Sequence, residues 1–142
     1  MSGTILVTDT LFIGPEHVQA LNQAGYEVVR LEESSATEEE LISNIQGKVG
    51  YILGGTEKVT PAVIQAADQL RAIVFTGTDW QSYIPGYDHA TQKGIVIANA
   101  PGANAYSVAE YTVMLILLML RRGLELGSTG TTKFMTTGSV ID

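Results

Sequence analysis

Short apolar runs alternate along the chain with segments whose apolar residues recur at helical spacing. The runs are rich in Val, Ile and Leu and predict five β-strands, at residues 4–9, 26–31, 49–55, 72–77 and 95–100. The intervening segments predict four helices, at residues 15–25, 37–47, 60–70 and 88–94, and a longer helix begins near Asn104. The chain therefore alternates strand and helix from end to end.

Start and stop signals support the predicted helices. Thr37 followed three residues later by Glu40 is typical of a capping box, and Thr60 before a proline is typical of an N-cap. Gly25 and Gly47 stand where a helix would end in a left-handed residue.

Alternation of strands and helices predicts right-handed crossovers and a parallel sheet covered on both faces. The expected architecture is an α/β flavodoxin-like three-layer sandwich with a five-stranded parallel sheet of order 2-1-3-4-5. A chain of 142 residues suffices for one such domain with its own core.

The segment APGANAYSVAEYTVMLILLML, residues 100–120, predicts a long apolar C-terminal helix. Its part from Tyr111 to Leu120 carries no charge and is too short to span a bilayer, so we expect it to drive self-association as a homodimer. The expected divisions are a domain at 1–103, an interdomain or dimerisation helix at 104–122, and a linker or tail at 123–142.

Composition narrows the classes of function. The net charge is -7, and no cluster of Lys and Arg exists to neutralise phosphates, which argues against nucleic acid. The chain has no cysteine, so disulfides, thiolate metal sites and cysteine nucleophiles are excluded. With no secretory signal or membrane span visible, a cytoplasmic protein is expected.

Familiar catalytic motifs are missing from the sequence. There is no G-x-G-x-x-G, P-loop or G-x-S-x-G, and His17 and His89 stand on separate predicted helices as surface residues. We therefore assign no catalytic residue and no metal ligand. Three loops rich in small residues follow the third, fourth and fifth strands, and their backbone N–H groups can form an anion nest or simply make the turns.

The order of these pieces resembles a known family. The stretch from Val59 to Arg122, with TPAVIQAADQLRAI, TGTD, ATQKGI and APGANAYSVAEYT in that order, is similar to the catalytic domain of the D-isomer-specific 2-hydroxyacid dehydrogenases. The resemblance implies a substrate-binding domain that closes with an NAD(P)-binding Rossmann domain over a 2-hydroxy or 2-oxo acid.

The resemblance also implies roles for particular residues. Substrate carboxylate would be held by backbone N–H groups of the loops containing Gly55-Thr56 and Gly77-Thr78, and Asn104 would lie at the hinge facing the cleft. NAD or NADP would bind the two-domain parent and not this chain tightly. The arginine, glutamate and histidine that the family uses for catalysis would come from the second domain, so this chain alone is expected to be inactive.

Some positions leave two readings open. Related sequences commonly carry glycine where this one has Asp79, whose carboxylate would repel an acidic substrate unless it points away or is protonated. Asp79 could instead hydrogen-bond its own loop as a turn residue, and we favour this role. Trp80 and Tyr83 either line the cleft or pack the loop onto the core. Ser107 and Glu110 have capping-box spacing, for which we expect a structural role.

Two functions remain in competition at this point. The first is the substrate-binding domain of an NAD(P)-dependent D-2-hydroxyacid dehydrogenase; the alternative is a stand-alone small-acid-binding or protein-interaction module derived from one. Flavin binding rests on fold analogy alone, because no phosphate-binding loop follows the first strand.

Overall fold

The computed structural model describes residues 2–8, 11–31 and 35–121, and every structural statement below refers to these residues. The chain divides after Pro101 into two units, residues 1–101 and 102–142. The predicted linker or tail at 123–142 lies outside the described residues.

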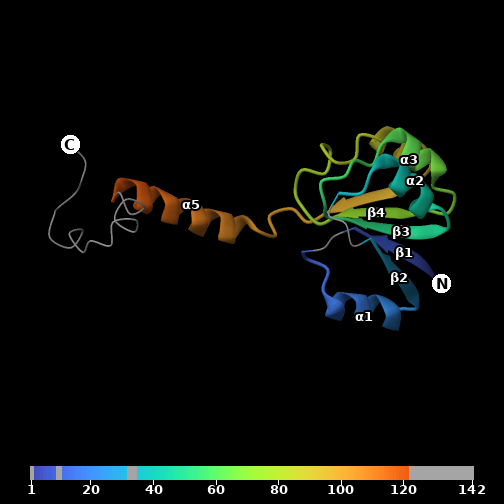
Figure 1. Cartoon of the computed structure of the whole chain (residues 1–142), viewed down its shortest axis with the longest axis horizontal. Helices are drawn as coiled ribbons and strands as arrows, with labels where there is room; N and C mark the ends of the chain where they lie inside the picture. Colours follow the sequence, from blue (N-terminus) through green and yellow to red (C-terminus); the bar gives the residue numbers. More distant parts are fainter. Residues whose placement is uncertain (1, 9–10, 32–34, 122–142) are drawn as a thin grey trace. The chain divides into compact units, whose positions relative to one another are not determined.

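The first unit alternates strand and helix as the sequence predicts (Figure 1). Its strands are β1 (Gly3–Val7), β2 (Tyr26–Arg30), β3 (Lys48–Leu53), β4 (Ala72–Phe75) and β5 (Val96–Asn99). Its helices are α1 (Pro15–Gln23), α2 (Glu38–Ile45), α3 (Pro61–Ala66) and α4 (Tyr87–Gln92). The second unit contains α5 (Ala105–Leu120).

All neighbouring strands pair in parallel, in the order β2-β1-β3-β4-β5. This is the order of flavodoxin-like sheets, and the prediction of it is confirmed. Because every strand runs the same way, the loops that follow β3, β4 and β5 leave the sheet at its carboxyl edge, where open α/β sheets bind ligands.

Local signals place the helices of the first unit. The Thr37 hydroxyl accepts a hydrogen bond from the Glu40 N–H at 3.3 Å, and the Glu40 carboxylate accepts one from the Thr37 N–H at 2.8 Å. Thr60 caps α3 by accepting from the Val63 N–H. Gly47, with φ of 70°, follows α2 in the left-handed conformation that glycine adopts without strain. These predicted caps are confirmed.

The core lies between the sheet and the layer formed by α2, α3 and α4. Figure 1 shows α2 and α3 on one face of the sheet and α1 on the other. Fully buried side chains from the sheet and from these helices fill the space between them, among them Leu6, Leu41, Tyr51, Ile64 and Ile73.

The opposite face of the sheet is covered less completely than predicted. Ile5 and Val7 of β1 are buried, and neither belongs to the core cluster that contains Leu6. Val74 of β4 is 38% exposed and Val96 of β5 is 63% exposed. Within residues 1–101, no described helix covers this face over β4 and β5. Within residues 1–101, the nine-residue α1 is the one described helix on that face, and it contacts β2.

Helix α5 corrects two expectations about the C-terminal stretch. It has 16 residues and includes polar side chains in its first half, so the long apolar helix is instead a shorter one with an apolar second half. No helix in the described part of the chain is long and apolar enough to cross a membrane. The helix begins at Ala105, so Ser107 lies inside its first turn and forms no capping box with Glu110.

Candidate functional site

The candidate site is the carboxyl edge of the sheet, at the loops that follow β3 and β4. In the sheet register Leu53 of β3 lies opposite Phe75 of β4, so Gly55 and Gly77 each stand two residues past the end of a neighbouring strand. The Thr76 N–H donates to the Leu53 carbonyl at 3.0 Å and extends the pairing one residue beyond the strands. The two loops therefore start side by side.

A chain of hydrogen-bonded, buried side chains anchors the loop that follows β3. The hydroxyls of Thr8 and Tyr51 lie 3.1 Å apart, and the Tyr51 hydroxyl donates to Glu57 Oε1 at 3.3 Å. Thr8 is fully buried and Glu57 is 4% exposed. This chain joins the end of β1, the middle of β3 and the loop after β3.

The environment of the Tyr51 hydroxyl shifts its pKa. Burial raises the pKa of the Tyr51 hydroxyl; the hydrogen bond from Thr8 opposes this rise, and the neighbouring Glu57 carboxylate adds to it. Glu57 Oε2 is buried and has no hydrogen-bond partner. The sequence pattern alone did not predict this cluster; its signals are a tyrosine inside an apolar strand and a glutamate shortly after a Gly-Gly pair.

Contacts between the two loops hold them together. The Val59 N–H donates to the Tyr83 carbonyl at 2.9 Å, and the Gly86 N–H donates to the Val59 carbonyl at 2.9 Å. Lys58 Nζ donates to the Ser82 carbonyl at 2.6 Å and lies 4.2 Å from the centre of the Tyr83 ring. These contacts join the segment after β3 to the segment after β4.

The second loop is also held from the side of β5. The Ala100 N–H donates to the Gly77 carbonyl at 3.1 Å, and Asn99 Nδ2 donates to the Thr78 carbonyl at 3.0 Å. A Cβ at Gly77 would lie 2.6 Å from the Phe75 ring, so the close approach of the loop to that ring requires glycine here.

These contacts use the carbonyls of the second loop and leave N–H groups of both loops without partners. Within the described residues, we find no hydrogen bond donated by the backbone N–H of Gly55, Thr56, Gly77 or Thr78. Thr56 and Thr78 are exposed, and the two glycines are partly exposed. The edge therefore offers four backbone N–H groups without a described acceptor, on residues that are at least partly exposed.

The structure shows the surroundings of the three side chains whose roles the sequence left open, Asp79, Trp80 and Tyr83. Trp80 and Tyr83 pack against the core, with Tyr83 stacked on Phe75 at a ring-centre distance of 4.9 Å. Asp79 is exposed and makes no hydrogen bond to any described residue, so the structure shows no turn role for it.

Asn104 belongs to the second unit, where it precedes α5. Its side chain makes no cap hydrogen bond to the helix. The structure thus brings Gly55, Thr56, Gly77, Thr78 and Asp79 together in one unit, and the roles assigned to them and to Asn104 stay predictions.

The described residues also form a cavity outside the two candidate loops. A cavity of about 500 Å³ lies at the start of α1 beside Arg30, whose guanidinium donates to the Ile13 carbonyl. Among the described residues there is no group of three or more His, Cys, Asp or Glu side chains that could hold a metal ion. His17 and His89 are both exposed, as expected.

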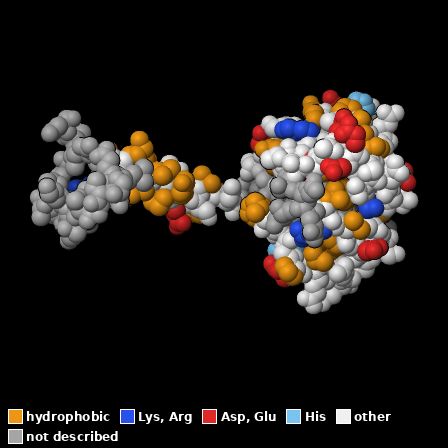
Figure 2. Space-filling view, viewed as in Figure 1, with side chains coloured by type: hydrophobic (Ala, Val, Ile, Leu, Met, Phe, Trp, Pro, Cys, Tyr) orange, Lys and Arg blue, Asp and Glu red, His pale blue; other side chains and the backbone are white. Residues whose placement is uncertain are grey.

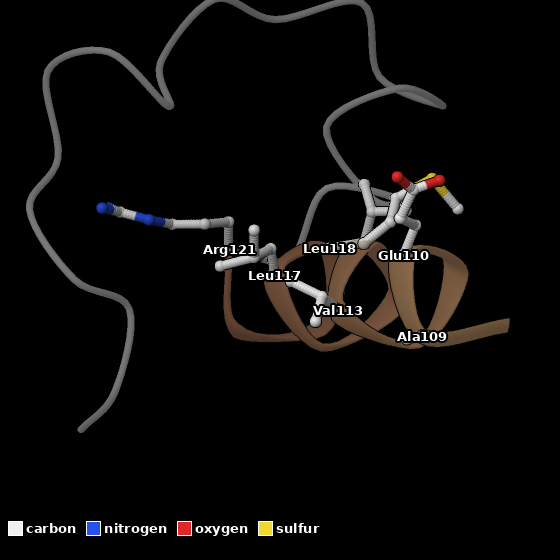
Figure 3. Close-up of a pocket in the computed structure, with 7 residues that line it drawn as sticks. Ala109, Glu110, Val113, Leu117, Leu118 and Arg121 are labelled. Carbon is white, nitrogen blue, oxygen red and sulfur yellow. The ribbon is translucent and has the colours of Figure 1, made fainter. Parts of the chain in front are cut away.

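An exposed apolar surface lies in the second unit, along α5. An open groove of about 700 Å³ runs along one side of this helix and is lined mainly by aliphatic side chains (Figure 3). Figure 2 shows hydrophobic side chains along the helix.

The sequence matches a family model described as D-isomer specific 2-hydroxyacid dehydrogenase, catalytic domain, over residues 5–141. It is 34% identical to human D-3-phosphoglycerate dehydrogenase over 118 residues, which are 83% of this chain and 21% of that protein. It is 37% identical to glyoxylate reductase of Thermofilum pendens over 92 residues, or 61% of this chain and 25% of that protein.

Among solved structures, NAD+-bound 3-phosphoglycerate dehydrogenase of Entamoeba histolytica is similar, with a TM-score of 0.70 and 28% identity. The similarity covers 87% of this chain and 41% of that one. The present chain spans about a fifth of the length of the curated phosphoglycerate dehydrogenases that it matches.

Proposed function

The chain belongs to the family of D-isomer specific 2-hydroxyacid dehydrogenases through its catalytic domain, and we propose that it binds the 2-hydroxy or 2-oxo acid of an NAD(P)-dependent member. Such an enzyme interconverts the two acids by hydride transfer. The observation that carries the proposal is the set of backbone N–H groups without a described acceptor on Gly55, Thr56, Gly77 and Thr78, at the carboxyl edge of the sheet.

These donors suit a substrate carboxylate for a physical reason. Hydrogen bonds from N–H groups to a carboxylate are charge-assisted and stronger than bonds between neutral groups. Because the loops are already held by Lys58, Asn99 and the Val59–Tyr83 pair, little order has to be gained when the anion binds. The proposed role of this chain is to bind and orient the acid.

The cofactor does not fit the residues present here. The 142 residues contain no G-x-G-x-x-G between a strand and a helix, the fingerprint that holds a dinucleotide pyrophosphate. A bound nicotinamide would supply the hydride for reduction of the 2-oxo acid. We propose that the cofactor and the acid–base residues come from a second domain.

The remaining proposals concern partners and location. We propose that the chain forms a homodimer through the exposed apolar residues of Tyr111 to Leu120, since Tyr111 is 59% exposed, Leu117 57% and Met119 74%. We expect no nucleic acid or membrane partner, and we expect the protein in the cytoplasm.

An amide titration by ¹⁵N NMR tests the proposed substrate site. Adding glyoxylate or D-lactate to the 142-residue chain should give saturable shifts at the amides of Gly55, Thr56, Gly77 and Thr78. The amides of Gly25 and Gly47 follow helices outside the two candidate loops and should stay unchanged.

Lactamide is the matched control ligand, because it keeps the shape of lactate and removes the charge. We expect lactamide to leave the four loop amides unshifted at the same concentrations. Equal responses to lactate and lactamide, or shifts that avoid the two loops, would show that this edge is not a carboxylate site.

A further inference from the structure

The cavity at the start of α1 has the size of a small-molecule site. Its volume is about 500 Å³, within the range of about 300 to 1,000 Å³ that is usual for ligand pockets. It lies between α1, the segment before this helix and the carboxyl end of β2 (Figure 1). Six residues that line it are Ile13, Pro15, Val18, Gln19, Asn22 and Arg30.

One side of α1 faces this cavity and not the core. Pro15, Val18, Gln19 and Asn22 are three or four residues apart, so they share one side of the helix. No residue of α1 is fully buried, and none belongs to the core cluster. The described residues therefore leave this side of α1 without the packed core that α2 and α3 have on the other face of the sheet.

Arg30 gives the cavity its charge. It is the last residue of β2 and the one charged side chain among the described residues that line the cavity. Its guanidinium donates to the Ile13 carbonyl, which holds the side chain against the cavity wall. A guanidinium carries five N–H groups in a planar fork, so the same side chain can bond this carbonyl and a ligand carboxylate together.

The remaining lining combines apolar and amide side chains. Ile13 and Val18 are partly buried and offer aliphatic surface, while Gln19 and Asn22 are exposed and offer groups that both donate and accept hydrogen bonds. Glu16, the nearest acidic residue along α1, does not line the cavity. The cavity is therefore an apolar hollow with a cation on one side and neutral polar groups at its mouth.

We propose that this cavity binds a small aliphatic monocarboxylate. The carboxylate pairs with the Arg30 guanidinium, and the hydrocarbon part lies against Ile13 and Val18. None of the residues that line the cavity belongs to the loops after β3 and β4, so this site does not depend on the acid binding proposed for those loops.

The lining favours this class of ligand over others. An amine would be repelled by the guanidinium, and a phosphate would bring more charge than one arginine neutralises. A neutral hydrocarbon would lie beside the guanidinium without giving it an acceptor. A carboxylate with a short aliphatic chain matches both the single cation and the aliphatic side chains.

Hexanoate is the probe for this site, because it has no 2-hydroxy or 2-oxo group. Titration of the 142-residue chain, followed by ¹⁵N NMR, should give saturable shifts at the amides of Val18, Gln19 and Asn22, with a Kd on the order of 1 mM. Hexanamide keeps the shape of hexanoate and removes its charge, so it should bind at least tenfold more weakly.

Two substitutions on α1 test where the carboxylate lies. Gln19→Glu places a negative charge at the cavity and should raise the Kd for hexanoate about fivefold. Gln23→Glu places the same charge on a residue of α1 that does not line the cavity, and it should leave the Kd within about twofold. Both glutamines are exposed, so neither change disturbs packing.

Three results would overturn the proposal. The first is a lack of saturable shifts at the α1 amides, including the case in which hexanoate shifts only the amides of Gly55 and Gly77. The second is equal binding of hexanoate and hexanamide, and the third is an equal effect of the two glutamate substitutions. The amides of α1 and of the two loops report separately, so failure here leaves the proposed acid site to its own titration.

Discussion

At the scale of single residues, the Tyr51 hydroxyl is the link in the buried chain between Thr8 and Glu57. Replacing Tyr51 with Phe removes both hydrogen bonds and leaves two buried polar groups without a partner. We expect Tyr51→Phe to lower the free energy of unfolding by about 1–3 kcal/mol, measured by urea denaturation.

Tyr26 provides the matched control for this substitution. It is only half-buried in β2, and Tyr26→Phe should change the free energy of unfolding by less than about 0.5 kcal/mol. Equal effects of the two substitutions would show that the buried chain contributes little to stability.

The raised pKa of the Tyr51 hydroxyl predicts how the free energy of unfolding changes at alkaline pH. Tyrosine loses its proton with an ordinary pKa of 10.0, and burial raises the pKa of Tyr51 in the folded state. Above pH 10 the unfolded chain therefore releases a proton that the folded chain keeps. The contribution of Tyr51 to the free energy of unfolding is therefore fully present below about pH 10. It falls as pH rises, by up to about 1.4 kcal/mol per pH unit.

Tyr51→Phe isolates this contribution, because the other tyrosines titrate in both proteins. We expect urea denaturation between pH 9 and 11 to show a smaller loss of stability per pH unit in the variant. Identical slopes for the two proteins would mean that Tyr51 ionises in the fold as readily as in the unfolded chain.

Asp79 makes a residue-scale prediction about binding. Its carboxylate is exposed beside the proposed donors of Gly77 and Thr78, so it repels an anion there. We expect Asp79→Asn to tighten binding of D-lactate or glyoxylate about two- to fivefold in the NMR titration. Asp88→Asn in α4 is the matched control and should leave the affinity unchanged.

At the scale of elements, the loops after β3 and β4 act together through Lys58. Lys58→Met keeps most of the aliphatic stem and removes the ammonium that bonds to the Ser82 carbonyl and lies over the Tyr83 ring. We expect weaker acid binding, by about three- to tenfold, and faster hydrogen exchange in both loops.

Lys48 gives a control of the same chemistry away from the candidate loops. Its ammonium bonds to the Gln46 carbonyl at the start of β3, and Lys48→Met should leave both loops and the affinity unchanged. If Lys58→Met alters affinity without altering exchange, its charge acts directly on the anion and not through the frame.

Elements also show what sequence patterns predict and what they miss. Thr37 and Glu40 form the expected capping box because a cap depends on residues three apart. Ser107 and Glu110 have the same spacing and form none, because the turn at Gly102, with φ of 72°, is followed by a helix that already begins at Ala105. The spacing of two residues therefore does not predict where the preceding turn ends and the helix begins.

Long-range contacts were the part that patterns could not predict. Thr8 and Tyr51 are 43 residues apart, and only the parallel register of β1 and β3 brings their hydroxyls together. Strand order, in contrast, follows from short right-handed crossovers and was predicted correctly. The candidate loops were found because they follow strands, but their shared anchoring by Lys58 and Asn99 emerged only from the structure.

At the scale of the whole molecule, the chemistry of the family is divided in two. The residues proposed to bind the acid are in this chain, and the residues that would bind the cofactor and transfer protons are proposed to lie in a second domain. The chain offers donors for an acid and no dinucleotide fingerprint. We expect it to show no turnover of glyoxylate with NADH alone. Turnover by the isolated 142-residue chain would contradict the proposed second domain.

The native polypeptide that carries this domain gives the last prediction. An antibody against residues 1–101 should detect, in lysates of the source cells, a band of roughly twice the 15.2 kDa of this chain or more, because a cofactor domain of ordinary size adds at least as much mass. A single band at 15.2 kDa would instead favour the stand-alone binding module. In that case the NMR titration would decide whether the module binds an acid, and sedimentation equilibrium of the 142-residue chain would decide whether it acts as a dimer.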